Sequence, residues 1–298
     1  MGPVLENADR AAEEPAEVPL PAGGREFWRR FRRSRAGVIG LGLVAVLVVV
    51  ALVAPVVVPG DPQTTSLVTL APPRTPGHPL GTDNLGRDVL SGVLWGSRVS
   101  LTVGVCAAAT AVLLGILIGA AAGFYGGWTD AVLSRGTELF QVIPRFVLAL
   151  LVVALFGSGL WKLIFVIAIL SWPQAARVVR GQFLALRGAA YVDAARVLGL
   201  RSARIIFSEI LPNVLAPVVV IASLDVAGAI LLEASLGFFG LGDPNRVSWG
   251  MMLNTAQAHL RQAWWMSVFP GVAISLAVLG FNLMGDGLND AANPRLDA

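Results

Sequence analysis

The sequence predicts an all-helical membrane protein with six transmembrane helices, and three observations lead to this fold class. Of the 298 residues, 55% are hydrophobic and only 14% are charged, whereas a typical soluble domain is about 25% charged. The mean hydropathy is +0.72. The apolar residues fall in runs of about 20, the length that crosses a bilayer as a helix. A β-barrel would instead show short alternating strands, so helices are the expected spanning elements.

The N-terminal part predicts a tail, a basic flank and a first helix. Residues 1–24 are rich in Glu, Ala and Pro and have no apolar period, which is typical of a disordered tail. Residues 25–60 follow as a basic flank and the first transmembrane helix: six arginines precede an apolar run at about 36–59. This run is longer than the apolar region of a signal peptide and lacks a small-residue cleavage site. We therefore expect an uncleaved first helix.

Five further spans and the segments between them complete the predicted organisation. An outer loop is expected over 61–98, a core over 99–290 and a short tail over 291–298. The spans of the core are expected at about 99–122, 139–157, 161–180, 213–235 and 265–285. Only Gly157-Ser-Gly159 and its immediate neighbours separate the third span from the fourth, which predicts a helical hairpin.

The basic residues predict the orientation of these spans. If the N-terminus lies inside, 16 of the 22 Lys and Arg residues fall on the inner side and 6 on the outer side. Cytoplasmic loops of membrane proteins carry such an excess of positive charge. We therefore expect both termini in the cytoplasm, with inner loops at about 123–138 and 181–212.

Several classes of chemistry are excluded by what the chain lacks. Lys162 is the only lysine and is not part of a Gly-Lys-Ser/Thr sequence, so no P-loop for ATP is expected here. Cys106 alone forms no disulfide and no CxxC pair, and His78 with His259 are too few for a histidine-rich metal site. Scattered arginines argue against nucleic-acid binding. We expect no catalytic residue, metal or cofactor on this chain.

The inner loop over 181–212 is the most informative polar segment. Its first part is rich in alanine, a good helix former, and ends at Gly199, a typical C′ residue. Ser202 is expected to cap a second helix, Ala203–Leu211, which ends at Pro212. Isoleucine and phenylalanine give this second helix an apolar face at Ile205, Ile206, Phe207 and Ile210. A helix-turn-helix of this kind suits docking into the groove of a partner protein.

This loop also resembles a known motif. The stretch Tyr191-Val-Asp193-Ala194-Ala195-Arg-Val-Leu-Gly199, with Leu211-Pro212-Asn213 downstream, resembles the EAA loop of ABC-importer permeases. Asp193 stands where that family usually has Glu, and Ser208-Glu209 where the peptide-importer branch often has a basic residue and His. The resemblance implies a coupling helix that binds an ATPase subunit through Asp193, Ala194, Ala195, Gly199, Arg201, Arg204, Glu209, Leu211 and Pro212.

Other segments narrow the resemblance. The stretch His78-Pro-Leu-Gly-Thr-Asp83-Asn-Leu-Gly-Arg87-Asp88 is similar to the outer-loop signature of the C-type permease of dipeptide, oligopeptide and nickel importers. Segments that also fit this branch are Gly96–Leu101, Gly123–Trp128, Ser235–Gly242, Ser248–Met251 and Phe281–Asp290. The resemblance covers about residues 26–295.

The family implies a function and a set of partners. This chain and a B-type permease would enclose the pathway, and two ABC ATPase subunits, which bind ATP and Mg, would drive it. An extracytoplasmic substrate-binding protein would deliver a peptide, with nickel complexes, glutathione and oligosaccharides as alternative substrates. Rigid-body movement of the helices would give alternating access.

Three other functions are alternatives to an ABC permease. An ion-coupled secondary transporter would show inverted repeats and several intramembrane carboxylates, which we do not find in the sequence. An intramembrane enzyme would need a nucleophile and a base at membrane depth. The third alternative is an interaction scaffold that transports nothing.

Charged residues in the spans give further candidates. Asp225 lies near the middle of the fifth span, where a carboxylate is costly; it either faces the pathway or makes a structural hydrogen bond. Glu233, nearer the outer end, either contacts substrate or serves as a gate or packing contact. Arg145 follows Pro144 near the inner end of the third span, and we expect it to extend to the interface rather than line the pathway.

The outer loop contributes three charged candidates. Asp83, Arg87 and Asp88 are expected either to bind the substrate-binding protein or to pair with each other and hold the loop. Both interpretations are consistent with the sequence.

Overall fold

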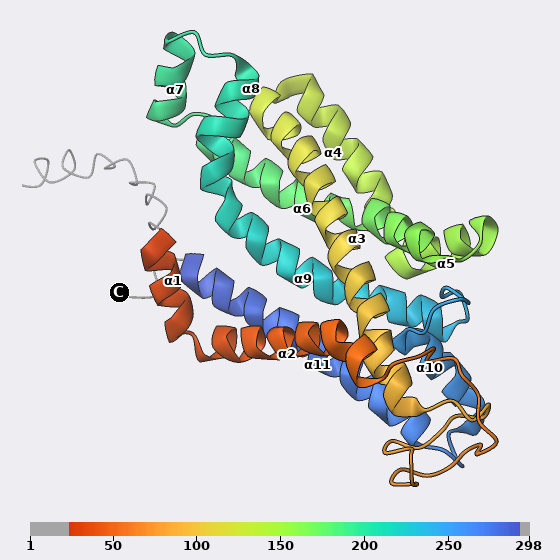
Figure 1. The fold of residues 1–298 in the computed structure, drawn as a ribbon. Helices are drawn as coiled ribbons and strands as arrows, with labels where there is room; N and C mark the ends of the chain where they lie inside the picture. Colours follow the sequence, from red (N-terminus) through yellow and green to blue (C-terminus); the bar gives the residue numbers. More distant parts are fainter. Residues whose placement is uncertain (1–23, 293–298) are drawn as a thin grey trace, which may run out of the picture.

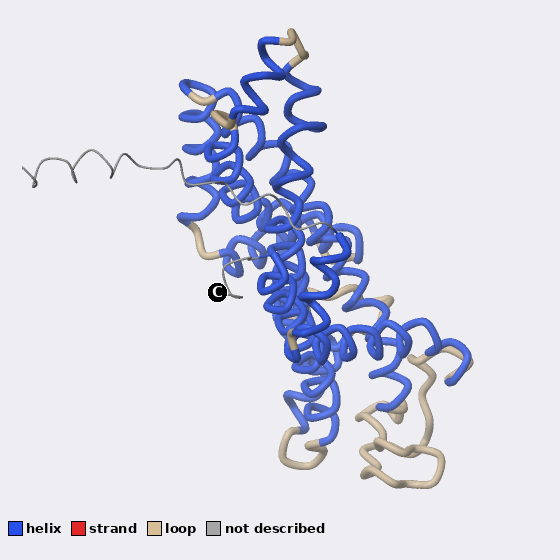
Figure 2. Tube along the Cα trace, turned by 90° about the vertical axis from the view of Figure 1, so that its left-hand side faces the viewer, coloured by secondary structure: helices blue, strands red, loops and turns tan. Residues whose placement is uncertain are grey.

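The computed structural model describes residues 24–292, which form a bundle of long helices without strands (Figures 1 and 2). The elements in chain order are α1 (Gly24–Arg33), α2 (Arg35–Val57), α3 (Val89–Tyr125), α4 (Gly127–Val142), α5 (Arg145–Phe156), α6 (Leu160–Leu186), α7 (Ala190–Val197), α8 (Ser202–Arg204), η2 (Ile205–Ile210), α9 (Leu211–Phe238), α10 (Trp249–Ala256), η3 (Gln257–His259) and α11 (Trp265–Ala292).

Within residues 24–292, five helical segments are long and apolar enough to cross a membrane: α2, α3, α6, the continuous run Ser202–Phe238, and α11. The pair α4 and α5 gives a sixth if it is counted as one broken span. The predicted all-helical class is therefore confirmed, and the expected tail over residues 1–24 lies almost entirely outside the described residues.

The third predicted span is wrong as a single straight helix. The chain forms two helices there, α4 and α5, bent by 82° at a break around Pro144. Ile143 is extended, as the residue before a proline tends to be, and this ends α4. Residues 127–138 of the inner loop expected over 123–138 are helical and belong to α4.

The outer loop ends earlier than expected. Helix α3 begins at Val89 rather than near residue 99, because Asp88 caps it and its Oδ2 accepts a hydrogen bond from Ser91 N at 2.8 Å. With 37 residues, α3 is about 55 Å long and exceeds the thickness of a bilayer core. At the other end of the chain, α11 continues to Ala292, so the tail predicted from residue 291 begins too early.

Glycines allow α3 and α6 to pack closely. Gly115, Gly119 and Gly123 repeat every four residues on α3 and face α6. A Cβ added at Gly115 would lie 2.5 Å from the Cβ of Ala175, and one at Gly119 would clash with the Ala176 carbonyl oxygen. Small residues at this spacing let transmembrane helices approach backbone to backbone.

The two ends of the described chain lie side by side. Ser34, which caps α2, donates a hydrogen bond from Oγ to Asp290 Oδ2 of α11 at 3.2 Å. Phe31 of α1 is buried against this junction. Helix α7 projects from the end of the bundle where α1 lies, and the long loop before α3 lies at the opposite end (Figure 1).

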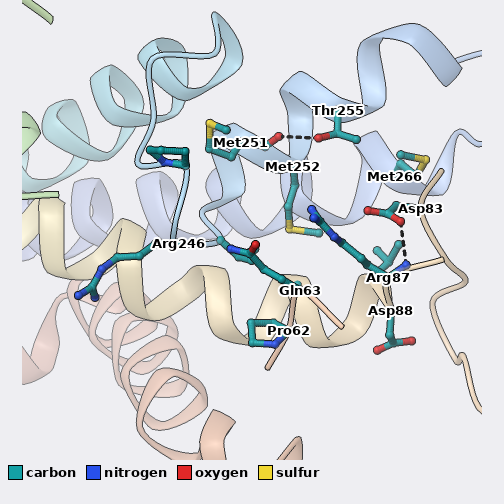
Figure 3. Close-up of a pocket in the computed structure, with 14 residues that line it drawn as sticks. Pro62, Gln63, Asp83, Arg87, Asp88, Arg246, Met251, Met252, Thr255 and Met266 are labelled. Atoms are coloured by element: carbon teal, nitrogen blue, oxygen red, sulfur yellow. Dashed lines mark hydrogen bonds between the residues drawn. The ribbon is translucent and has the colours of Figure 1, made fainter. Parts of the chain in front are cut away.

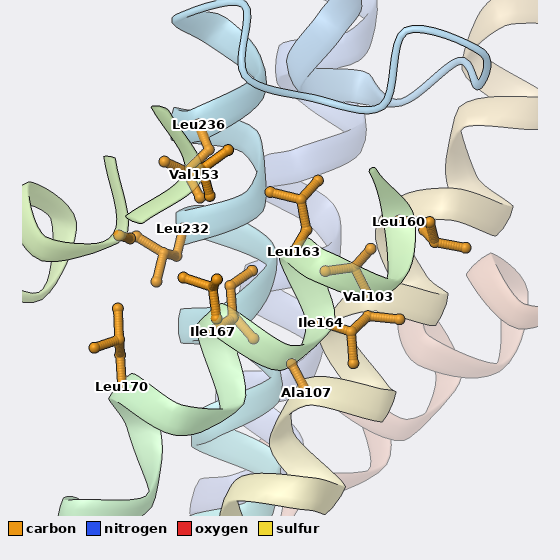
Figure 4. Close-up of a cluster of buried hydrophobic side chains, with 13 residues drawn as sticks. Val103, Ala107, Val153, Leu160, Leu163, Ile164, Ile167, Leu170, Leu232 and Leu236 are labelled. Carbon is orange, nitrogen blue, oxygen red and sulfur yellow. The ribbon is translucent and has the colours of Figure 1, made fainter. Parts of the chain in front are cut away.

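A buried apolar cluster joins α3, α5, α6 and α9 (Figure 4). Its members are Val103, Ala107, Ala149, Val153, Leu160, Leu163, Ile164, Val166, Ile167, Leu170, Ala229, Leu232 and Leu236. Through Ala149 and Val153, this cluster holds the short helix α5 against α6 and α9.

Candidate functional site

The loop with the predicted coupling motif forms a helical projection, defined here as residues 190–210. Helix α7 ends where the sequence predicts, because Gly199 has φ +74° and Leu200 N donates to Ala195 O at 3.1 Å. Asn213 Nδ2 donates to the Glu209 carbonyl at 2.8 Å and to the Tyr191 hydroxyl at 3.4 Å, which ties α7 to α9. Burial raises the pKa of the Tyr191 phenol.

The apolar face of the projection turns inward. Val192 and Ala195 of α7 pack with Ile205, Ile206 and Ile210 in one buried cluster, together with Val179 and Phe183 of α6. The apolar face predicted for the second helix is therefore present, and its isoleucines fix the projection to the bundle. Phe207 alone of that set is exposed.

The outward surface of the projection has an apolar tip. Val197 is 88% exposed and Leu198 is 79% exposed. Around this tip lie the exposed Asp193, Ala194, Gly199, Arg201 and Arg204. Asp193 forms an ion pair with Arg196 at 2.9 Å. Sequence reasoning missed Val197 and Leu198, whose exposure follows from the end of α7 at Gly199.

The second part of the projection does not end at Pro212. A π-helical turn, η2, leads directly into α9, with Leu211 N donating to Ile206 O. Pro212 lies in the first turn of α9, where proline is tolerated. Ser202 makes no side-chain capping hydrogen bond. Glu209 and Leu211 are half-buried and Pro212 is exposed.

In the loop before α3, the two predicted aspartates hold the backbone in place. Asp83 Oδ1 accepts hydrogen bonds from Leu85 N and Arg87 N, each at 2.8 Å. Asp88 Oδ1 lies 3.1 Å from His78 Nδ1, while its Oδ2 caps α3. The carboxylates thus bind backbone N–H groups and His78 rather than the Arg87 side chain.

Thr82 anchors this loop to the bundle and was not singled out by sequence reasoning. Its buried hydroxyl donates to Val68 O at 2.8 Å and accepts from Ala71 N at 2.9 Å. Its carbonyl accepts from Trp265 Nε1 of α11 at 3.1 Å.

We expect Thr82→Val to loosen the outer loop without changing its shape. The buried Ala71 N–H would lose its acceptor, which costs about 1–3 kcal/mol. Limited proteolysis of the outer loop in membrane vesicles should then become faster. Thr69→Val, at an exposed position nearby, is the control; equal cleavage of the two variants would contradict the anchor role.

A pocket of about 130 Å³ opens between the outer loop, α3, α10 and α11 (Figure 3). Met251, Met252 and Met266 form part of its apolar wall, and the Arg87 side chain extends beside Met252. Arg87 Nε is buried and has no hydrogen-bond partner among the described residues. Arg87 thus brings an unpaired N–H donor with a positive charge to this pocket.

Asp225 lies inside the bundle on α9. Asp225 is only 6% exposed, and its Oδ2 has no hydrogen-bond partner within the described part of the chain. Ala149 and Val153 of α5, the helix that begins at Arg145, pack in the same buried cluster as Ala229 of α9. Arg145 is half-buried and its Nη2 donates to Gln174 Oε1 of α6 at 3.2 Å.

Glu233 lies farther along α9 and is only 1% exposed. It accepts a hydrogen bond from Ser100 Oγ of α3 at 2.9 Å. Trp249 N of α10 in turn donates to Ser100 Oγ at 3.4 Å. This arrangement links α3, α9 and α10.

Comparison with known proteins gives two family matches. Residues 111–298 match the family described as binding-protein-dependent transport system inner membrane component. Residues 24–73 match the N-terminal TM domain of oligopeptide transport permease C.

Curated relatives align over nearly the whole chain. The chain is 41% identical to a putative peptide permease protein of Brucella suis over 271 residues, 90% of each chain. It is 36% identical to a dipeptide transport system permease protein of Alkalihalophilus pseudofirmus, over 91% of this chain and 90% of the relative. It is 39% identical to a glutathione transport system permease protein of Pectobacterium atrosepticum, over 91% of both.

Proposed function

The chain belongs to the family of binding-protein-dependent transport system inner membrane components, and on this premise we propose that it is the C-type permease of an ABC peptide importer. It is a membrane permease and forms the pathway together with a second, B-type permease. The chain itself is non-catalytic. Energy comes from two ATPase subunits, which bind ATP and Mg.

The exposed apolar tip of the projection is the observation that carries this proposal. Val197 and Leu198 are exposed at the end of a short helix that is itself fixed to the bundle. Apolar side chains presented in this way are typical of an interaction site. The arginines at positions 201 and 204 and the carboxylate of Asp193 form its polar rim, which suits an ATPase cleft.

Crosslinking tests this assignment directly. In the assembled importer, a photo-reactive amino acid at position 198 should crosslink to an ATPase subunit. The same group at position 67, an exposed residue of the outer loop, should crosslink to the substrate-binding protein. Capture of the binding protein from position 198 would contradict the proposal.

The orientation follows from the same assignment. The projection, α1 and the C-terminal end of α11 lie toward one end of the bundle (Figure 1), and we place this end in the cytoplasm. The excess of arginines on this side supports both termini inside. The long loop before α3 then faces the extracytoplasmic side.

Peptides are the substrate class best supported. The relatives are called peptide, dipeptide and glutathione permeases, and glutathione is itself a peptide. Nickel complexes and oligosaccharides remain the alternatives within this function. Ion-coupled transport is the alternative outside it, and the final experiment of the Discussion separates the two.

Arg87 is the residue of the outer loop that we assign to docking of the substrate-binding protein. Its buried Nε is unpaired within the described residues, whereas Asp83 and Asp88 hold the loop. An acidic side chain of the binding protein would satisfy it.

We expect Arg87→Ala to weaken binding of the substrate-binding protein about tenfold, because truncation removes a charge-assisted contact worth roughly 1.5 kcal/mol or more. Binding to the permease in nanodiscs is the measurement. Arg261→Ala, at an exposed outer position, should change it little; equal losses in the two variants would point to general charge steering.

Within the membrane, we assign Asp225 to the pathway and Glu233 to packing. Asp225 has an unsatisfied buried oxygen that a substrate group or water can bind. The hydrogen bond from Ser100 supports a structural role for Glu233, which holds α3 and α9 together.

A further inference from the structure

Arg145 of α5 and Asp225 of α9 lie on helix faces that pack against each other in the buried cluster of Figure 4. This contact between α5 and α9 is called the seam below. On α5, Arg145, Ala149 and Val153 recur every four residues and share one face. On α9, Asp225, Ala229, Leu232 and Leu236 recur at helical spacing on one face. The apolar members of both sets belong to one buried cluster.

Both charged residues lie at the same end of the seam, away from Val153 and Leu236. Val153 and Leu236 lie together at one end of the cluster (Figure 4). Arg145 comes about two helical turns before Val153, and Asp225 comes about three turns before Leu236. The two groups therefore lie toward the same end of α5 and α9, although neither a hydrogen bond nor an ion pair at contact distance joins them.

Both groups keep bonding capacity for a ligand. The Asp225 carboxylate has one buried oxygen without a partner in the described chain. Within the described residues Arg145 donates a hydrogen bond to Gln174, and a guanidinium can donate five. Three residues further along α9, a Cβ added at Gly228 would meet no atom within 4 Å, so the helix surface is open at that position.

We infer that Arg145 and Asp225 form a charge-selecting pair in the transport pathway. Asp225 binds the cationic part of a passing peptide and Arg145 its anionic part. Together they keep this stretch of the pathway electrically neutral, so that peptides without net charge pass well. This inference rests on the proposed function and adds a role for Arg145, which sequence reasoning had placed at the interface.

The mechanism follows from electrostatics in a poorly hydrated site. A single unpaired charge at this depth would attract solutes of opposite charge and repel those of like charge, by a few kcal/mol at protein-like dielectric constants. Two opposite charges on adjacent helices cancel each other's field at a distance, so an approaching solute is neither attracted nor repelled according to its net charge. Close to the pair, they bind the two termini of a zwitterion.

The test is uptake of three dipeptides by proteoliposomes that contain the complete importer: alanyl-lysine, alanyl-alanine and alanyl-glutamate. For Arg145→Gln, we expect the uptake ratio of alanyl-lysine to alanyl-glutamate to rise about tenfold over the unmodified importer. For Asp225→Asn, the ratio should fall by about the same factor. The variant with both substitutions should return to the original ratio.

Matched controls remove a charge outside the seam. Arg135→Gln and Glu138→Gln neutralise an exposed ion pair of α4 and should leave the ratio unchanged. Assembly of every variant with its partners is checked by size-exclusion chromatography. The double variant keeps the test decisive where one unpaired charge impairs assembly.

Two results would overturn the inference. A parallel loss of uptake of all three peptides at an unchanged ratio means that the pair only supports structure. A double variant whose ratio stays altered means that the two residues do not act together. If the unmodified importer takes up none of the three peptides, the peptide substrate in the proposed function is wrong and the inference falls with it.

Discussion

Replacing both Val197 and Leu198 by aspartate abolishes ATP-driven uptake by the assembled importer. These two side chains are the apolar tip of the projection and are almost fully exposed. Buried in a partner's groove, side chains of this kind dominate the binding energy, and two charges in their place would be desolvated without partners. We expect at least about a hundredfold weaker association with the ATPase subunits, equivalent to about 2.8 kcal/mol.

The measurement is co-purification of the ATPase subunits together with uptake in proteoliposomes. Val197→Ile combined with Leu198→Met keeps the tip apolar and serves as the control, with association close to that of the unmodified chain. The bundle itself should be unaffected, since neither side chain is buried in it. Normal uptake by the aspartate pair would show that the projection is not the coupling surface.

Gly119→Leu should prevent the folded permease from accumulating. Gly119 lies where α3 crosses α6, and any side chain there would meet the Ala176 carbonyl and the side chain of Val179. Neither of these can move without separating the two helices, which hold the centre of the bundle. Overpacking of this severity is expected to cost more than about 3 kcal/mol.

The measurement is the yield of monodisperse protein and its thermal midpoint in detergent. Gly271→Leu is the matched control, because a Cβ at Gly271 of α11 meets no atom within 4 Å. It should leave both values close to those of the unmodified chain. Similar losses in the two variants would indicate a general effect of leucine on insertion, not a clash at the α3–α6 crossing.

Most of the spans could be predicted from apolar runs because a bilayer imposes a fixed length on a helix. The failures lie where polar residues continue a helix. Residues 89–98 contain serine, glycine and arginine and read as loop, yet the Asp88 cap starts α3 before them. Pro144 breaks the third span, but a sequence does not reveal how sharply the chain turns there.

The candidate site was predictable only in part, and the reason lies in tertiary contacts. Gly199 as a helix end follows from local chemistry. Which side of the projection faces outward depends on packing against α6. Ile205 and Leu198 are equally apolar, yet Ile205 is buried in that contact and Leu198 is exposed, which the sequence alone does not reveal. That Arg145 and Asp225, far apart in sequence, lie toward the same end of α5 and α9 depends on the register of these two helices.

Energy coupling is the most direct test of the proposed function. The measurement is uphill dipeptide uptake by proteoliposomes that hold this chain, its partner permease, the ATPase subunits and the substrate-binding protein. The proposal predicts uptake that requires ATP and continues when ion gradients are collapsed. Uphill uptake by the two permeases without any ATPase subunit, driven by an ion gradient, would contradict it.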